Sequence, residues 1–207
     1  GVYLNGVIMC STVLDFPTIS FTPGNDLPYA LYLPSYAAVA WYHNKVHAKP
    51  ASLDALVAQA KEFASGQYEH ALFEGAALPV AEKQQIADRL SQLTGIPANL
   101  WIEANLRMTL PVYMRRLLGP EGPQTGRYDG RFTTPELQPL LPMPGEGSAG
   151  AVTSTLMGAL TATFGNYLSR TLNYTSGRLY KQLNFEVNRN WDWKFEPPLN
   201  DMGTGNV

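Results

Sequence analysis

Apolar and β-branched side chains run almost without interruption from Val7 to Leu14, and Ser11 is the least apolar position among them. A run of this kind is typical of a strand that is covered on both faces in a parallel sheet. A single strand cannot form a sheet, and the chain from Pro28 to about Leu118 has the pattern of helices instead. The sequence therefore predicts one strand whose neighbours come from another segment or another chain.

The helical region contains a clear amphipathic segment. Positions at i, i+3, i+4, i+7 and i+10 define one helix face, formed by Leu53, Leu56, Val57, Ala60 and Phe63. Ser52 is placed to cap the start of this helix, whereas Gly66 is expected to interrupt or end it. Earlier in the chain, Pro34 is expected to kink or restart a helix, because proline removes a helical hydrogen bond.

Shorter helices follow the amphipathic segment. Apolar residues recur every three or four positions from Ile86 to Leu93, and Gly95 is placed to end that helix. Two further short helices are predicted at Leu100 to Leu106 and at Leu110 to Leu118. The middle of the chain is therefore predicted to be a small helical bundle.

The last third of the chain is less regular. Six prolines and several glycines between Gly119 and Gly150 predict a long, mostly extended loop. A longer helix is predicted next, ending near Asn173, from an i+4 ridge that comprises Val152, Leu156, Leu160, Phe164, Leu168 and Leu172. The tail from Asn190 to Val207 is polar and aromatic and has no period.

Composition and charge narrow the classes of function. The 207 residues are 45% hydrophobic and 15% charged, which indicates a folded protein rather than a disordered one. A net charge of -2 leaves no excess of positive charge to neutralise phosphates, so nucleic acid is not expected as a partner. No apolar run approaches the roughly 18 residues that span a bilayer. Cys10, the single cysteine, excludes an internal disulfide and is expected to be a small buried apolar residue.

Two motifs resemble reactive sites, but each lacks a residue that the site would require. His43 and His47 have the spacing at which two imidazoles share a metal ion, but no third ligand lies nearby in the sequence. Ser148 lies in a glycine-rich stretch, but Glu146 stands where a nucleophile elbow requires glycine. Residue spacing therefore predicts no catalytic constellation and no metal site.

An aromatic cluster follows the first loop and comprises Tyr29, Tyr32, Tyr36, Trp41 and Tyr42. Side chains at these offsets cannot all face one side of a helix. We expect most of them to lie in the core, and one or two to line a cleft and offer hydroxyls to a ligand.

In their order along the chain, eight short stretches resemble the bacterial branch of the serine carboxypeptidases. They are Leu4–Ile8, Ser11–Phe16, Asn25–Tyr29, Leu33–Tyr36, Ala40–His43, Ala104–Arg107, Gly126–Thr133 and Asn190–Trp193. Members of that family are α/β-hydrolases that release single residues from peptide C-termini through a serine, aspartate and histidine triad. The resemblance implies no cofactor and a secreted or periplasmic location.

The resemblance also implies a division of the chain. Residues 1–20 would be a core strand of the hydrolase sheet with its exit loop, residues 21–189 a helical cap inserted into the hydrolase, and residues 190–207 a return segment. The implied fold is mostly α, with one or a few strands that belong to the α/β-hydrolase sheet. The family's triad lies outside the stretches that match, so these residues alone are expected to be inactive. The remaining hydrolase core, in the same longer chain or a partner chain, is then an expected partner.

A cap of this kind shapes the substrate cleft by walling the pocket and excluding water. We expect Asn25, Tyr29, Tyr36 and Tyr42, which are near the strand exit in sequence, to border the cleft and bind the peptide substrate. Two alternatives remain open. One is a helical binding module without chemistry, and the other is a hydrolase cap that acts on esters or acyl donors, because a fold does not fix its chemistry.

Overall fold

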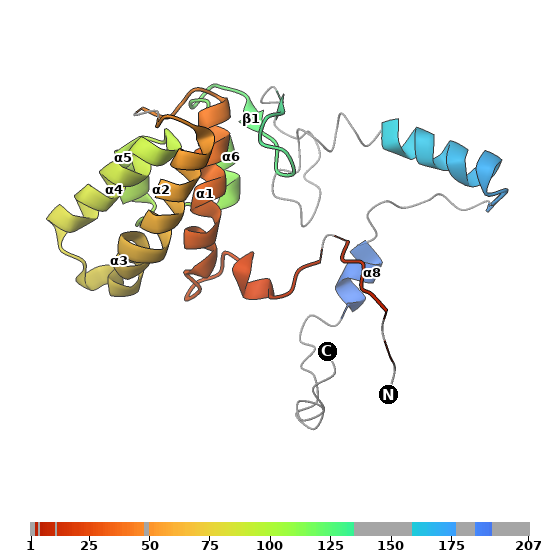
Figure 1. Ribbon diagram of the computed structural model, residues 1–207, viewed down its shortest axis with the longest axis horizontal. Coiled ribbons are helices and arrows are strands. Elements are labelled where there is room, and N and C mark those ends of the chain that lie inside the picture. The colour runs from red at the N-terminus through yellow and green to blue at the C-terminus, as the bar shows by residue number, and fades with distance from the viewer. Residues whose placement is uncertain are drawn as a thin grey trace. The chain divides into compact units, whose positions relative to one another are not determined.

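The computed structural model describes residues 3, 5–10, 12–47, 50–134, 159–176 and 185–191. The chain divides into two units, Gly1–Thr155 and Leu156–Val207. The described part of the first unit is mostly helical, as predicted (Figure 1). Its elements are η1 (Phe16–Thr18), α1 (Leu27–Tyr42), α2 (Leu53–Phe63), η2 (Ala64–Tyr68), α3 (Glu69–Glu74), η3 (Gly75–Ala77), α4 (Val80–Thr94), α5 (Ala98–Glu103), α6 (Leu110–Arg116), β1 (Gln124–Thr125) and β2 (Thr133–Thr134).

Two predicted helix boundaries are confirmed. The Ser52 hydroxyl accepts a hydrogen bond from the Ala55 amide at 3.1 Å, which satisfies one of the free N–H groups at the start of α2. Gly95 ends α4 in the left-handed conformation, with φ of 72°. A Cβ there would lie 2.6 Å from the Lys45 carbonyl oxygen, so this close approach also requires glycine.

Two predicted interruptions have different outcomes. The restart at Pro34 is wrong, because Pro34 lies inside α1, where packing of the buried face outweighs the one hydrogen bond that proline removes. The interruption at Gly66 is confirmed, because α2 ends at Phe63 and Gly66 lies in the π-helical turn η2. This turn joins α2 to α3, and Phe63 and Tyr68 stay buried on either side of Gly66.

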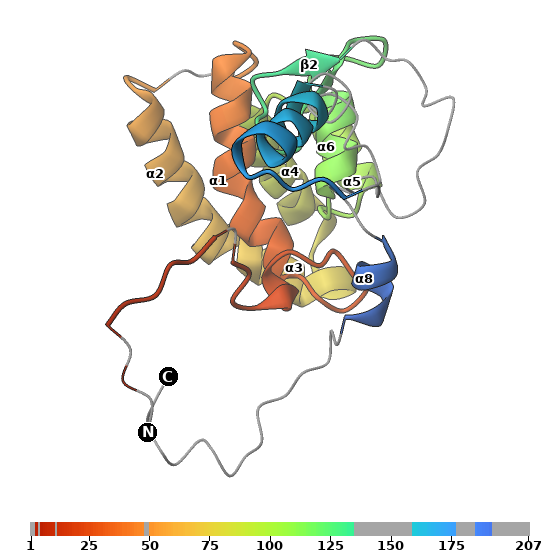
Figure 2. The same cartoon turned by 90° about the vertical axis from the view of Figure 1, so that its right-hand side faces the viewer.

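The core forms around α1. Figure 2 shows α2 on one side of α1 and α6 on the other. Leu33 and Ala37 of α1 are fully buried, and they belong to one apolar cluster with Leu56, Leu90 and Trp101. Of the aromatic cluster, Tyr29 and Tyr36 lie in this core, Tyr32 and Trp41 pack against it partly buried, and Tyr42 is exposed.

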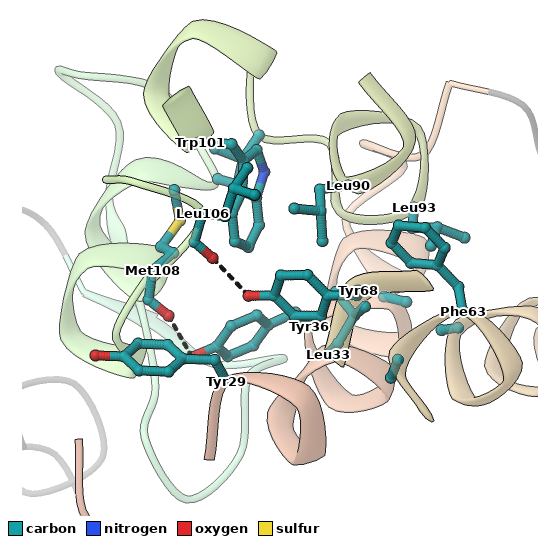
Figure 3. Packing of buried hydrophobic residues seen from close by; sticks show 14 of the residues in the cluster. Tyr29, Leu33, Tyr36, Phe63, Tyr68, Leu90, Leu93, Trp101, Leu106 and Met108 are labelled. Atoms are coloured by element: carbon teal, nitrogen blue, oxygen red, sulfur yellow. Dashed lines mark hydrogen bonds between the residues drawn. The ribbon is translucent and has the colours of Figure 1, made fainter. Parts of the chain in front are cut away.

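Buried tyrosines form hydrogen bonds that hold the turn between α5 and α6 against the core, as Figure 3 shows. The Tyr68 hydroxyl donates to the Leu106 carbonyl at 2.6 Å, and the Tyr36 hydroxyl donates to the Met108 carbonyl at 3.4 Å. Arg107 closes the same turn through two 2.6 Å hydrogen bonds to the Asp26 carboxylate. Leu106 has φ of 63°, and these bonds hold it in that unfavourable conformation.

The described residues near the start of the chain do not form the expected strand by themselves, and because its neighbours were expected from another segment or chain, the strand stays a prediction. Residues 7–10 and 12–14 form no strand, and Ile8 and Leu14 are 90% and 83% exposed. Cys10, expected to be buried, is also exposed. The reason is that a strand needs a neighbour for its N–H and C=O groups, and no described segment pairs with this one.

A short hairpin follows α6, within the first part of the predicted loop. Strands β1 and β2 pair antiparallel, with Gln124 opposite Thr134 and Thr125 opposite Thr133. The rest of the proline-rich segment, residues 135–150 with Ser148, lies outside the described residues.

The second unit contains a helical segment over residues 159–166, which continues as the π-helical turn η4 (Tyr167–Thr171), and α8 (Phe185–Asn190). The predicted helix end is confirmed, because Asn173 has φ of 52° directly after it. Residues 192–207, most of the predicted return segment, lie outside the described residues. Among the helices described in either unit, none is long and apolar enough to cross a membrane.

Candidate functional site

A pocket of about 380 Å³ lies in the first unit, where α1, α6 and the β1–β2 hairpin meet. Helix α1 contributes four residues at i, i+3, i+4 and i+7, which lie on one helix face. The lining residues are Tyr32, Ser35, Tyr36, Val39, Leu110, Tyr113, Met114, Thr125, Gly126, Arg127, Tyr128 and Gly130.

Two stacked tyrosines join α1 to α6 beside the pocket. The rings of Tyr36 and Tyr113 lie 4.0 Å apart and only 8° from parallel. The Tyr113 hydroxyl donates to the Tyr36 carbonyl at 2.6 Å, which adds a directional contact to the stacking. Burial raises the pKa of both hydroxyls well above the usual value, so both remain neutral and neither is a base at neutral pH.

The hairpin forms the opposite wall and is attached to both helices. The Thr125 hydroxyl donates to the Met114 carbonyl of α6 at 3.4 Å, and His43 Nε2 donates to the Gly130 carbonyl at 2.7 Å. Gly130 also packs closely on α1, because a Cβ there would lie 2.5 Å from a methyl group of Val39. The absence of a side chain at residue 130 thus lets the hairpin close onto α1.

The polar groups at the pocket are few. Ser35 and Thr125 supply hydroxyls, and Arg127 supplies one cation, which lies 6.0 Å from the centre of the Tyr128 ring. Asp129, two residues away, forms an ion pair with Arg131 instead, at 2.6 Å. Within the described part of the chain, no carboxylate pairs with Arg127.

The lining has the composition of a binding site. Among the described residues it includes serine, threonine and tyrosine hydroxyls and one guanidinium, and no carboxylate, histidine or cysteine. Aromatic and aliphatic walls with a few polar groups are typical of sites for small ligands. Nor do the described residues contain a group of three or more His, Cys, Asp or Glu side chains that could hold a metal ion.

The structure separates the four residues expected to bind substrate. Tyr36 lines the pocket, whereas Asn25 donates through its amide to the Pro17 and Ser20 carbonyls. Tyr29 is nearly buried and packs edge-to-face on Phe21. Tyr42 is 55% exposed and does not line the pocket.

The sequence analysis did not identify several lining residues. Ser35 and Val39 share helical spacing with Tyr32 and the expected Tyr36, so the α1 face was detectable in the sequence. Arg127 gave no such signal, because it reaches the pocket only when the hairpin folds back onto α1. A scan against family models and searches of curated proteins and of solved structures find no match to this chain.

Proposed function

We propose that this chain is the helical cap segment of a larger serine carboxypeptidase-like hydrolase that releases C-terminal residues from peptides. One observation carries the proposal: two of the stretches that resemble the family meet at the pocket. Leu33–Tyr36 contributes residues of α1, and Gly126–Thr133 contributes the hairpin wall, although about ninety positions separate them in sequence. In this proposal the pocket receives part of the peptide substrate.

The exposed apolar segment supports the part of the proposal that concerns a larger protein. Ile8 and Leu14 are almost fully exposed, although such side chains are normally buried in a folded protein. A strand in a sheet built by the remaining hydrolase core would cover both faces of this segment. By the resemblance alone, we also propose that the protein is secreted or periplasmic.

The test is an assay of the protein that contains this chain together with the rest of the hydrolase. We expect it to release the C-terminal residue from N-blocked dipeptides, measured by mass spectrometry, and the 207-residue chain alone to release none. Hydrolysis of simple esters without peptide cleavage would favour the ester alternative. Absence of both activities would contradict a hydrolase altogether.

A pocket variant then tests the role of the cap. Ser35→Trp places a large ring at the pocket, and we expect it to raise KM for the dipeptides about tenfold while kcat changes little, because it removes binding rather than chemistry. Ser65→Trp is the matched control, since Ser65 is exposed in η2 and does not line the pocket. Equal KM values for the two variants would contradict a role of the pocket in substrate binding.

A second candidate function is a binding module without chemistry. It is favoured by the pocket lining, which is mainly aromatic and aliphatic and, among the described residues, includes no carboxylate, histidine or cysteine. The same assays separate the two functions. A binding module would hold a ligand in this pocket, and the larger protein that contains this chain would cleave neither peptides nor esters.

A further inference from the structure

The pocket lining indicates one class of ligand more than others. Four tyrosines, Tyr32, Tyr36, Tyr113 and Tyr128, contribute to the lining together with Met114. Aromatic rings and a thioether pack favourably against another aromatic ring. A volume of about 380 Å³ is also large enough for a ring with a short substituent.

The charge at the pocket is positive. Arg127 is exposed to solvent and lies with its guanidinium near the Tyr128 ring. Asp129 does not neutralise it, because Arg131 occupies that carboxylate through hydrogen bonds from its guanidinium and its backbone amide. Arg127 therefore has no acidic partner among the described residues and is available to the carboxylate of a ligand. Arginine binds carboxylates with two parallel hydrogen bonds.

We infer that the pocket binds small aromatic carboxylates, with the aromatic ring among the tyrosines and the carboxylate on Arg127. The inference names the ligand chemistry of the pocket in the proposed function, and its link to peptide substrates rests on that proposal. Binding itself needs no catalytic group, so it can be measured on the 207-residue chain.

Two ligands of nearly equal shape provide the test. N-acetyl-phenylalanine carries a carboxylate, and N-acetyl-phenylalaninamide carries a neutral amide in its place. We expect the carboxylate to bind about three- to tenfold more tightly at pH 7 and low salt, as one exposed charge-assisted contact would give. Titration calorimetry supplies the affinities, and shifts of the Tyr113 and Tyr128 resonances locate the site.

Charge removal provides the second arm. Arg127→Gln should abolish the preference for the carboxylate and leave the affinity for the amide unchanged. Arg116→Gln is the matched control, because Arg116 is an exposed arginine of α6 that does not line the pocket, and it should leave both affinities unchanged. Equal affinities in the unmodified chain, a preference that survives Arg127→Gln, or binding of neither ligand would each overturn the inference.

These outcomes separate the inference from the proposed function. Binding of the carboxylate by this chain, with no peptide cleavage by the larger protein, would support the ligand class and contradict the hydrolase. Peptide cleavage by the larger protein, with no carboxylate preference in this chain, would support the hydrolase and contradict the ligand class.

Discussion

At the scale of single residues, buried tyrosines decide how the helices join. A phenol hydroxyl is costly to bury unless it forms a hydrogen bond. Tyr36, Tyr68 and Tyr113 each meet this requirement by donating to a backbone carbonyl that lies distant in sequence. Each bond therefore satisfies the hydroxyl and fixes the position of a second helix or turn.

Tyr68→Phe tests this role. The substitution keeps the ring but leaves the Leu106 carbonyl without its 2.6 Å donor, in a turn where Leu106 has an unfavourable φ of 63°. We expect the free energy of unfolding to fall by about 1–3 kcal/mol, the usual cost of a buried group left unsatisfied. Chemical denaturation measures it, with Tyr42→Phe as the exposed control, expected to change stability by less than about 0.5 kcal/mol. Equal effects would show that the hydroxyl of Tyr68 contributes nothing.

At the scale of elements, the β1–β2 hairpin depends on contacts with other parts of the pocket for its stability. Its strands have two residues each, and such short pairings are marginal in water. The hairpin instead relies on the contact of Gly130 with α1 and on the Asp129–Arg131 ion pair within its loop. Its position, and so the position of Arg127, depends on these contacts.

The ion pair predicts a response to acid. Hydrogen bonds from the Arg131 guanidinium and amide lower the pKa of Asp129 to about 2. A lowered pKa means that the contact is complete at pH values above the ordinary aspartate range and is lost as the pH falls through about 2. We expect the carboxyl carbon of Asp129 to titrate near that value by NMR.

Arg131→Gln is the comparison for this titration. It removes the charge that favours the ionised carboxylate, so the pKa of Asp129 should rise toward the ordinary aspartate value. An unchanged titration would show that Arg131 is not the cause of the lowered pKa.

At the scale of the molecule, the first unit combines a well-packed helical core with an apolar segment that the core does not cover. Leu33 of α1 is fully buried, whereas Ile8 is 90% exposed. Burial of apolar surface therefore stabilises the helices, whereas the apolar side chains of the segment that contains Ile8 contribute little to the stability of the first unit. This contrast separates residues that stabilise the helices from residues available to a partner.

The contrast predicts two different effects of the same substitution. Ile8→Asp should change the free energy of unfolding by less than about 0.5 kcal/mol and should reduce self-association, because it removes exposed apolar surface. Leu33→Asp should prevent folding, because it places a charge in the core. Circular dichroism during thermal unfolding and size-exclusion chromatography check both. A large loss of stability in Ile8→Asp would show that the segment packs on the helices.

Local signals in the sequence were enough to predict most of the helices. Ser52 and Gly95 mark helix ends through contacts with nearby backbone, so their effect is visible in a short stretch of sequence. Local signals misled at Pro34, where burial of the surrounding helix face outweighs a local preference and α1 does not restart. At residues 7–10 and 12–14 the predicted strand stays a prediction, because apolar composition indicates that a strand is favourable but cannot supply the strand beside it.

The pocket depended on tertiary structure. Tyr36 was a candidate from its place near the expected strand exit in sequence, but its partner Tyr113 is 77 residues away, and no periodicity links the two. Arg127 reaches the site because Gly130 lets the hairpin approach Val39 closely. Helix formation follows the order of neighbouring residues, whereas a pocket requires residues from separate elements to meet, and only packing in three dimensions determines which ones do.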